Sequence, residues 1–237
     1  MNDFGENNKY GFKSSEDEEW FEVHTGAVTN TTPGSMVDVI INTTRICPNM
    51  SNYEFRKEVM RARDIGVELI KRRIEGPARW DVKEQDRVKF FFARADESTK
   101  RLLSDGLPRL LVAMQELVPE KIVRFDSETN RKLTCAVKPD TGANHAVVCK
   151  PDSEKRVIAI YSQFCSSPFG QLWGTCKIKT IIHECTHFTD TFNSEDWVYT
   201  DKASGARIFA ENHPDQVIQN ADNITGYIAT FDGVNVT

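Results

Sequence analysis

The first long stretch with a regular apolar pattern is SNYEFRKEVMRARDIGVELIKRRIEG at 51–76. Ser51 is a suitable N-cap, and Gly76 closes the run. Between them, apolar residues recur every three or four positions, which is typical of one buried helix face. These residues are Phe55, Val59, Met60, Ile65, Val67, Leu69 and Ile70. The pattern predicts a helix over 51–76.

Similar spacing recurs further along the chain. It predicts helices at about 83–94, at 97–118 around a Gly-Leu-Pro interruption, at 175–191 and at 214–230. Residues 121–162 instead contain short alternating runs between turn residues: KIVRFD, KLTCAV, HAVVCK and RVIAIYSQF. Such runs are typical of strands. Helices, then a small sheet, then more helices predict a mostly helical α+β fold.

The first 50 residues differ from the rest. Residues 1–20 are polar, acidic and rich in Asn, Ser and Glu, so we expect them to be disordered or loosely docked. Residues 21–46 mix small, polar and β-branched residues, and MVDVIINTT predicts a short strand between turns. We therefore divide the chain into an N-terminal segment, 1–50, and one globular domain, 51–237.

Composition and charge narrow the function. Of the 237 residues, 39% are hydrophobic and 27% are charged, which fits a domain that can bury a sizeable core. The net charge of -5 argues against nucleic-acid or membrane-surface partners, because such proteins usually carry clustered basic residues. The densest basic stretch, KRRIEGPAR at 71–79, is short and interrupted, so we interpret it as a solvated helix face.

The six cysteines allow two interpretations. They are Cys47, Cys135, Cys149, Cys165, Cys176 and Cys185. None forms a CxxC pair, so a zinc site made of cysteines alone is not expected. The six could form up to three disulfides in an oxidising compartment, or they could be reduced and buried thiols. The sequence leaves both open.

Residues 183–187 read HECTH and carry the clearest chemistry. On a helix, His183 and His187 lie on one face and can bind a single zinc ion. Glu184 lies beside such a metal, where it can hold a water molecule and accept its proton. The preceding IKTII and the later Phe188 give the helix an apolar back. Cys185 faces away from the two histidines, so we expect it to pack in the core.

A catalytic zinc ion needs a third protein ligand. The remaining histidines are at His24, His145 and His213, and none has a familiar zincin spacing. Glu211 would have to lie on a following helix. Asp190 is still on the motif helix, so we expect it to contact a metal ligand or solvent rather than the metal. Asp196 follows His187 by nine residues, beyond a polar turn, so a loop can return it to the metal.

This region resembles the aspzincins, the family of deuterolysin and peptidyl-Lys metalloendopeptidase. Their HExxH motif is followed by a Gly-Thr-x-Asp-x-x-Tyr-like segment, and the step from aspartate to tyrosine is kept in DWVY at 196–199. Three further stretches are similar to family segments: VIAIYSQFC, VKFFFARADESTKRLL and NHPDQVIQNADNITGYIATF. The resemblance covers roughly residues 50–237.

The resemblance implies a zincin-like metalloprotease domain built on an HExxH helix, with one catalytic zinc ion and protein or peptide substrates. In this chain His183, His187 and Asp196 would bind the zinc, Glu184 would be the general base, and Tyr199 would stabilise the oxyanion. A carboxylate and two neutral imidazoles leave the ion a net positive charge, which suits this chemistry.

The chain departs from the family pattern at several positions. The Gly-Thr of the family reads Ser194-Glu195 here, and Thr200 replaces the glycine after the tyrosine. Some relatives select lysine after the cut with two acidic residues on the last helix. Asp222 matches the first of these acids, as a candidate substrate-binding residue, but the second position carries Thr225.

Two alternatives to an active peptidase are weighed: a catalytically silent aspzincin-like binding or effector module, and a structural α+β protein with a coincidental motif. Glu184 and Tyr199 are both intact, which argues against the silent module. The N-terminus has neither a basic start nor an apolar run, so it is no Sec-type signal peptide. We therefore expect a secreted toxin or effector delivered by a specialised secretion system, or a domain of a larger exported protein, with an inhibitory or immunity partner. Cytoplasmic function is the alternative.

Overall fold

The structure is a computed structural model that describes residues 44–171 and 173–229. Our expectations for residues 1–20, and for nearly all of the strand expected in 21–46, lie outside this part of the chain. The longer helices are α1 (Asn52–Arg79), α2 (Val82–Phe92), α3 (Glu97–Glu116), α6 (Lys177–Thr186), α7 (Ala203–Asn212) and α8 (Ala221–Ala229). The mostly helical α+β fold is therefore confirmed.

Short elements connect these helices. The strands are β1 (Ile122–Arg124), β2 (Ala146–Val148) and β3 (Ile158–Ile160). Single-turn helices are α4 (Glu128–Arg131) and α5 (Ser162–Ser166), and the 3₁₀ turns are η1 (Pro119–Lys121), η2 (Lys150–Lys155) and η3 (Val217–Gln219).

Helix α1 begins as the sequence predicts but continues past its expected end. Ser51 accepts a hydrogen bond from the Glu54 backbone amide, and the Glu54 carboxylate accepts one from the Ser51 amide, which makes a capping box. Gly76 does not close the helix, because it lies inside the core against Glu84, where a Cβ would come within 2.5 Å of Glu84 Oε2. The helix ends only at Trp80, which has a left-handed backbone conformation with φ of 49°.

Helix α3 is continuous through Pro108, so the interruption expected from Gly-Leu-Pro is wrong. The reason is tertiary packing, which outweighs the poor helix propensity of the two residues. Leu107 and Leu110 are fully buried, and Gly106 lies directly against the ring of Phe192.

The small sheet has the order β1-β3-β2. Strand β3 pairs in parallel with β1, with Ile122 opposite Ile158, and antiparallel with β2, with Ala146 opposite Ile160. All three residues of β3 are buried, as expected for a central strand. Only three of the four expected runs are strands. KLTCAV is not one, because a disulfide between Cys135 and Cys149 holds this segment beside the end of β2.

The cysteines follow neither of the two interpretations in full. A second disulfide joins Cys47 to Cys165, and the thiols of Cys176 and Cys185 are free and buried. Cys185 packs in the core, as its position on the motif helix predicts.

The C-terminal helical region is divided. The helix expected at 214–230 is the short turn η3 followed by α8, and α7 precedes them without having been predicted. Helix α7 buries only Ala206 and Ala210, so its apolar stripe is too weak to stand out in the sequence.

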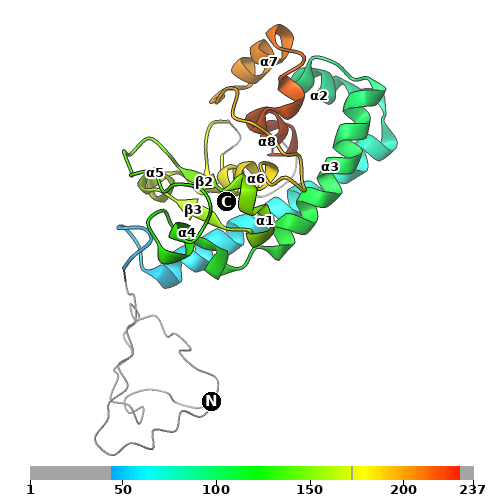
Figure 1. The fold of residues 1–237 in the computed structure, drawn as a ribbon. Helices are drawn as coiled ribbons and strands as arrows, with labels where there is room; N and C mark the ends of the chain where they lie inside the picture. The colour runs from blue at the N-terminus through cyan, green and yellow to red at the C-terminus, as the bar shows by residue number, and fades with distance from the viewer. Residues whose placement is uncertain (1–43, 172, 230–237) are drawn as a thin grey trace, which may run out of the picture.

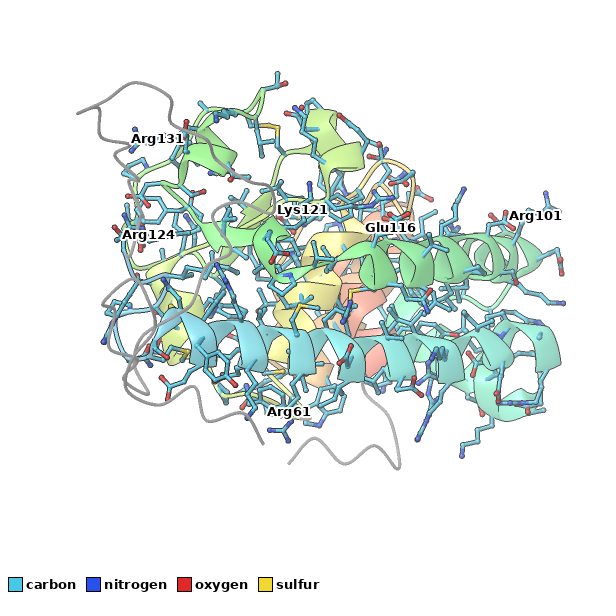
Figure 2. The ribbon with its side chains drawn as sticks, turned by 90° about the horizontal axis from the view of Figure 1, so that it is seen from below. Arg61, Arg101, Glu116, Lys121, Arg124 and Arg131 are labelled. Carbon is cyan, nitrogen blue, oxygen red and sulfur yellow. A yellow bond between two sulfur atoms is a disulfide. The ribbon has the colours of Figure 1, made fainter. Side chains whose placement is uncertain are left out.

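Figure 1 shows α6 in the middle of the molecule, with the sheet on one side and α2, α7 and α8 on the other. Figure 2 shows the two long helices α1 and α3 side by side, with Arg61 projecting outward from α1 and Arg101 from the start of α3. These two helices and α6 enclose a single apolar core. Within the described ranges, no helix combines the length and apolarity needed to cross a bilayer.

Replacing Gly106 by alanine should lower the free energy of unfolding by about 1–3 kcal/mol, because the new Cβ would lie 2.5 Å from Phe192 Cζ. Gly205→Ala in α7 is the matched control. Its Cβ would meet Thr200 Cβ at an ordinary 3.7 Å, and alanine favours a helix by roughly 0.5–1 kcal/mol over glycine. Denaturant unfolding of both variants measures the difference, and equal effects would contradict the packing described for α3.

Candidate active site

Helix α6 supplies the first residues of the site. It packs against α1 on one side and α8 on the other, so its last turn is enclosed. His183 and Glu184 lie in this last turn, and His187 follows at the C-cap position with a helical backbone. All three side chains are buried. The helix ends at Thr186, five residues before the end that the apolar pattern predicts.

A tight turn after α6 reverses the chain. Asn193 has φ of 50°, a left-handed conformation that asparagine adopts more readily than most residues. The backbone amide of Asn193 donates to Phe188 O at 3.2 Å, and that of Ser194 donates to Thr186 O at 3.1 Å. The turn therefore brings the following residues back over the end of the helix.

The turn delivers Asp196 to the two histidines. Its Oδ1 lies 3.0 Å from His183 Nε2 and 3.3 Å from His187 Nε2. Two donors that each bind zinc at 2.0–2.1 Å with tetrahedral angles stand about 3.3 Å apart, so these separations fit one zinc ion. Among the described residues, His183, His187 and Asp196 form the group of ligand atoms able to hold a metal.

The other nitrogen of each imidazole faces an acceptor. His183 Nδ1 lies 3.0 Å from Asp222 Oδ1, and His187 Nδ1 lies 3.0 Å from the Ser194 carbonyl. A hydrogen on each Nδ1 leaves the Nε2 lone pairs free and aimed at the same point, beside Asp196. This donor set, two neutral imidazoles and a carboxylate, fits a catalytic zinc ion.

Contacts between these groups shift the pKa values of Asp196 and His183. Burial raises the pKa of Asp196, but hydrogen bonds from His183 and His187 outweigh it and hold this pKa well below its usual range. Burial lowers the pKa of His183, yet its bonds to Asp196 and Asp222 raise it to about 10. Protons and a metal ion therefore compete for the same nitrogen.

Glu184 and Tyr199 flank the histidines. Burial raises the pKa of Glu184, although the two histidines counteract this. The ring of Tyr199 stacks on the His183 ring, with centroids 6.0 Å apart and an interplanar angle of 21°. Tyr199 is 70% exposed, so its phenol is open to an incoming molecule. Burial of part of this side chain, with Asp196 close by, raises the pKa of the phenol and keeps it a hydrogen-bond donor.

A cavity of about 340 Å³ opens beside Glu184. Its walls come from the segment that leads into β2, from residues 174–175 and one face of α6, from the loop at 199–201 and from α8. The site thus offers a metal-binding cluster, a buried carboxylate, an exposed phenol and an adjoining space for a side chain.

Comparison with known proteins agrees with this arrangement. A family model described as lysine-specific metallo-endopeptidase, the aspzincin model, matches residues 78–229. The chain belongs to the aspzincin family. It is accordingly a zinc-dependent metallo-endopeptidase, a hydrolase whose substrates are proteins or peptides.

A solved structure supports the fold of this aspzincin. It is a zinc peptidase from Grifola frondosa, which is 16% identical in sequence and matches with a TM-score of 0.56. The match covers 74% of this chain and 94% of the other. A comparison with curated protein sequences finds no match.

The remaining candidates from the sequence lie away from the metal cluster. Asp190 is past the end of α6 and pairs with Arg156, and Glu211 pairs with Arg207 on the surface of α7. His213 stacks on Phe209. His145 lines the cavity without joining the cluster, and His24 lies outside the described residues.

Sequence reasoning missed the residue that holds the loop carrying Asp196 and Tyr199. Asn220 is fully buried, and its Oδ1 accepts hydrogen bonds from the backbone amides of Trp197 and Val198 at 3.0 and 3.1 Å. Its Nδ2 donates to the Val198 carbonyl. The adjacent backbones also pair as an isolated parallel bridge between Glu195 and Asn220.

The role of Asn220 in holding this loop is only partly indicated by the sequence. The segment NAD at 220–222 is part of the resemblance to the family, but its asparagine has no charge or metal affinity to draw attention. Ser194 orients His187, because its carbonyl and its hydroxyl both face His187 Nδ1. The sequence alone does not indicate this contact.

Replacing Asn220 by alanine should loosen the loop that carries Asp196. Leaving the amides of Trp197 and Val198 without an acceptor should cost about 1–3 kcal/mol of unfolding free energy. Zinc affinity should fall about 10-fold, as for other groups that orient ligands. Competition with a chromophoric chelator measures the affinity, and exposed Asn212→Ala is the control. Unchanged zinc affinity in Asn220→Ala would show that the loop holds its position without this side chain.

Proposed function

We propose that this aspzincin cleaves peptide bonds with one zinc ion held by His183, His187 and Asp196. Zinc in such a site acidifies a water molecule and polarises the substrate carbonyl. The observation that carries the proposal is the convergence of both Nε2 atoms on Asp196 Oδ1 while each Nδ1 faces an acceptor. A buried cluster built only for stability has no need of that orientation.

Glu184 acts as the general base in this proposal. Glu184 lines the cavity next to His183, where the peptide bond would enter. The raised pKa of Glu184 makes it a better proton acceptor than an ordinary surface carboxylate. The same group can then pass the proton to the departing amine.

Tyr199 stabilises the negative charge that develops on the carbonyl oxygen. Its ring is held parallel to His183, and its loop is the one that supplies Asp196. A hydrogen-bond donor on the same loop as a metal ligand lies near the metal, where the oxyanion would form, as oxyanion stabilisation requires. The presence of both Glu184 and Tyr199 favours an active enzyme over a silent binding module.

The family description suggests a preference for lysine, and we propose that Asp222 supplies it here. Asp222 lines the cavity, and its carboxylate is only partly exposed. One oxygen faces His183 Nδ1, and the other accepts from the Thr200 amide at 2.5 Å. The Thr200 hydroxyl also donates to this second oxygen, at 3.4 Å. The oxygen that faces His183 keeps a second lone pair, so the same carboxylate can orient the histidine and attract a basic side chain near the cut.

Replacing Glu184 by glutamine should lower the rate of peptide cleavage about 10²–10⁴-fold, since the amide cannot accept the proton. Zinc should remain bound in a one-to-one ratio, because Glu184 is not a ligand. A denatured protein mixture is digested with wild type, wild type plus a zinc chelator, Glu184→Gln and the surface control Glu211→Gln, and new termini are mapped by mass spectrometry. Cleavage that persists in Glu184→Gln or with the chelator would reject the mechanism.

We further propose that this aspzincin is a toxin or effector exported by a specialised secretion system, with an inhibitory or immunity partner that protects the producing cell. Two disulfides, Cys47–Cys165 and Cys135–Cys149, support export, because disulfides are rare in reducing compartments. A protease without a narrow sequence requirement also has to be restrained until it is delivered.

Protein collected from outside the producing cells should contain two thiols and two disulfides. Alkylation before and after reduction, followed by mass spectrometry, should label Cys176 and Cys185 in denatured, unreduced protein and the other four cysteines only after reduction. Finding the protein only inside cells, with all six cysteines reduced, would contradict export.

A further inference from the structure

The cavity is also lined by a charged group that the proposed mechanism does not use. Lys179 lies one helical turn before His183, on the same face of α6, and it lines the cavity together with Asp222. The side chain is half-buried, and its Nζ donates to the Gly174 carbonyl at 3.1 Å. That hydrogen bond fixes an ammonium group in the wall of the cavity.

A second feature of the cavity wall is a hydroxyl group without a hydrogen-bond partner in the part of the chain that the structure describes. Thr225 lies three residues after Asp222 on α8, lines the same cavity, and is 4% exposed. Its Oγ1 is buried and has no hydrogen-bond partner among the described residues. Buried hydroxyl groups are nearly always hydrogen-bonded, so we expect this side chain to rotate and turn its hydroxyl toward a polar group that enters the cavity.

The cavity therefore presents charges of opposite sign to an incoming side chain. A lysine side chain is attracted by Asp222 but meets a like charge at Lys179. Asp201 also lines the cavity, but it is exposed and its charge is screened by water. A glutamine side chain meets no repulsion, because its carbonyl can accept from Lys179 or Thr225 and its amide can donate to Asp222.

We propose that Lys179 is a specificity-determining residue that opposes the attraction of Asp222 for lysine and admits glutamine at the same position after the cut. The inference rests on the proposed peptidase function and deepens it. Asp222 attracts a basic side chain toward α8, and repulsion from Lys179 reduces the resulting preference for lysine. The position that carries Thr225 here supplies a hydroxyl that pairs with a neutral side chain as readily as with a charged one.

The test compares two fluorogenic peptides that differ only in the residue after the cut, lysine or glutamine. The measured quantity is the ratio of kcat/KM for the lysine peptide to kcat/KM for the glutamine peptide. Lys179→Met should raise this ratio about 10-fold, since it removes the repulsion and the donor together. Lys179→Arg, which keeps the charge, should leave the ratio within about twofold of wild type.

Two further variants separate local from general effects. Lys89→Met removes the same charge from an exposed position on α2 that does not line the cavity, and the ratio should not change. Lys179→Gln can still donate to the Gly174 carbonyl, so it tests the charge if Lys179→Met folds poorly. It should raise the ratio about 5-fold.

The outcomes separate the specificity role of Lys179 from the peptidase function. If wild type cleaves both peptides, and the ratio is the same in wild type, Lys179→Met and Lys179→Gln, the specificity role of Lys179 is wrong and the peptidase function stands. If wild type with bound zinc cleaves neither these peptides nor denatured protein, the proposed function itself fails. A ratio that falls in both neutral variants would show that Lys179 favours lysine, and would also overturn the inference.

Discussion

Two buried imidazole rings must direct their Nε2 atoms to one point, and much of the C-terminal half of the molecule serves that requirement. Each ring needs an acceptor at Nδ1, and the acceptors come from different elements: Asp222 from α8 and the Ser194 carbonyl from the turn after α6. The loop that carries Asp196 then has to bring its carboxylate to the Nε2 atoms of both rings. Helices α6 and α8 are consequently packed against each other, and Asn220 joins the loop to α8.

The residues to which we assign the chemistry were largely visible in the sequence, whereas the residues that position them were not. His183, His187 and Asp196 carry donor atoms whose spacing has a chemical meaning, and the structure brings them together as expected. Asn220 acts by accepting backbone hydrogen bonds, and any polar residue could do so in some fold. Its role depends on where two distant segments meet, which no local pattern contains.

The same distinction applies to the secondary structure. Apolar periodicity located α1, α2, α3 and α6, because these helices bury broad faces. Predictions based on helix-breaking residues failed at Gly76 and Pro108, where close packing against Glu84 and the surrounding leucines decides the conformation. Helix α7 was missed because it contributes two alanines to the core and little else. Local propensity is thus a weak guide wherever burial is extensive.

The disulfide between Cys47 and Cys165 closes a loop of the chain with a sequence separation of 118 residues. All of α1, α2, α3 and the three strands lie within that loop. A single break in the backbone anywhere between the two cysteines would leave both fragments covalently joined, with α6 still tied to the helices that bury it. The molecule can therefore be nicked in its N-terminal half, by another protease or by a second copy of itself, without coming apart.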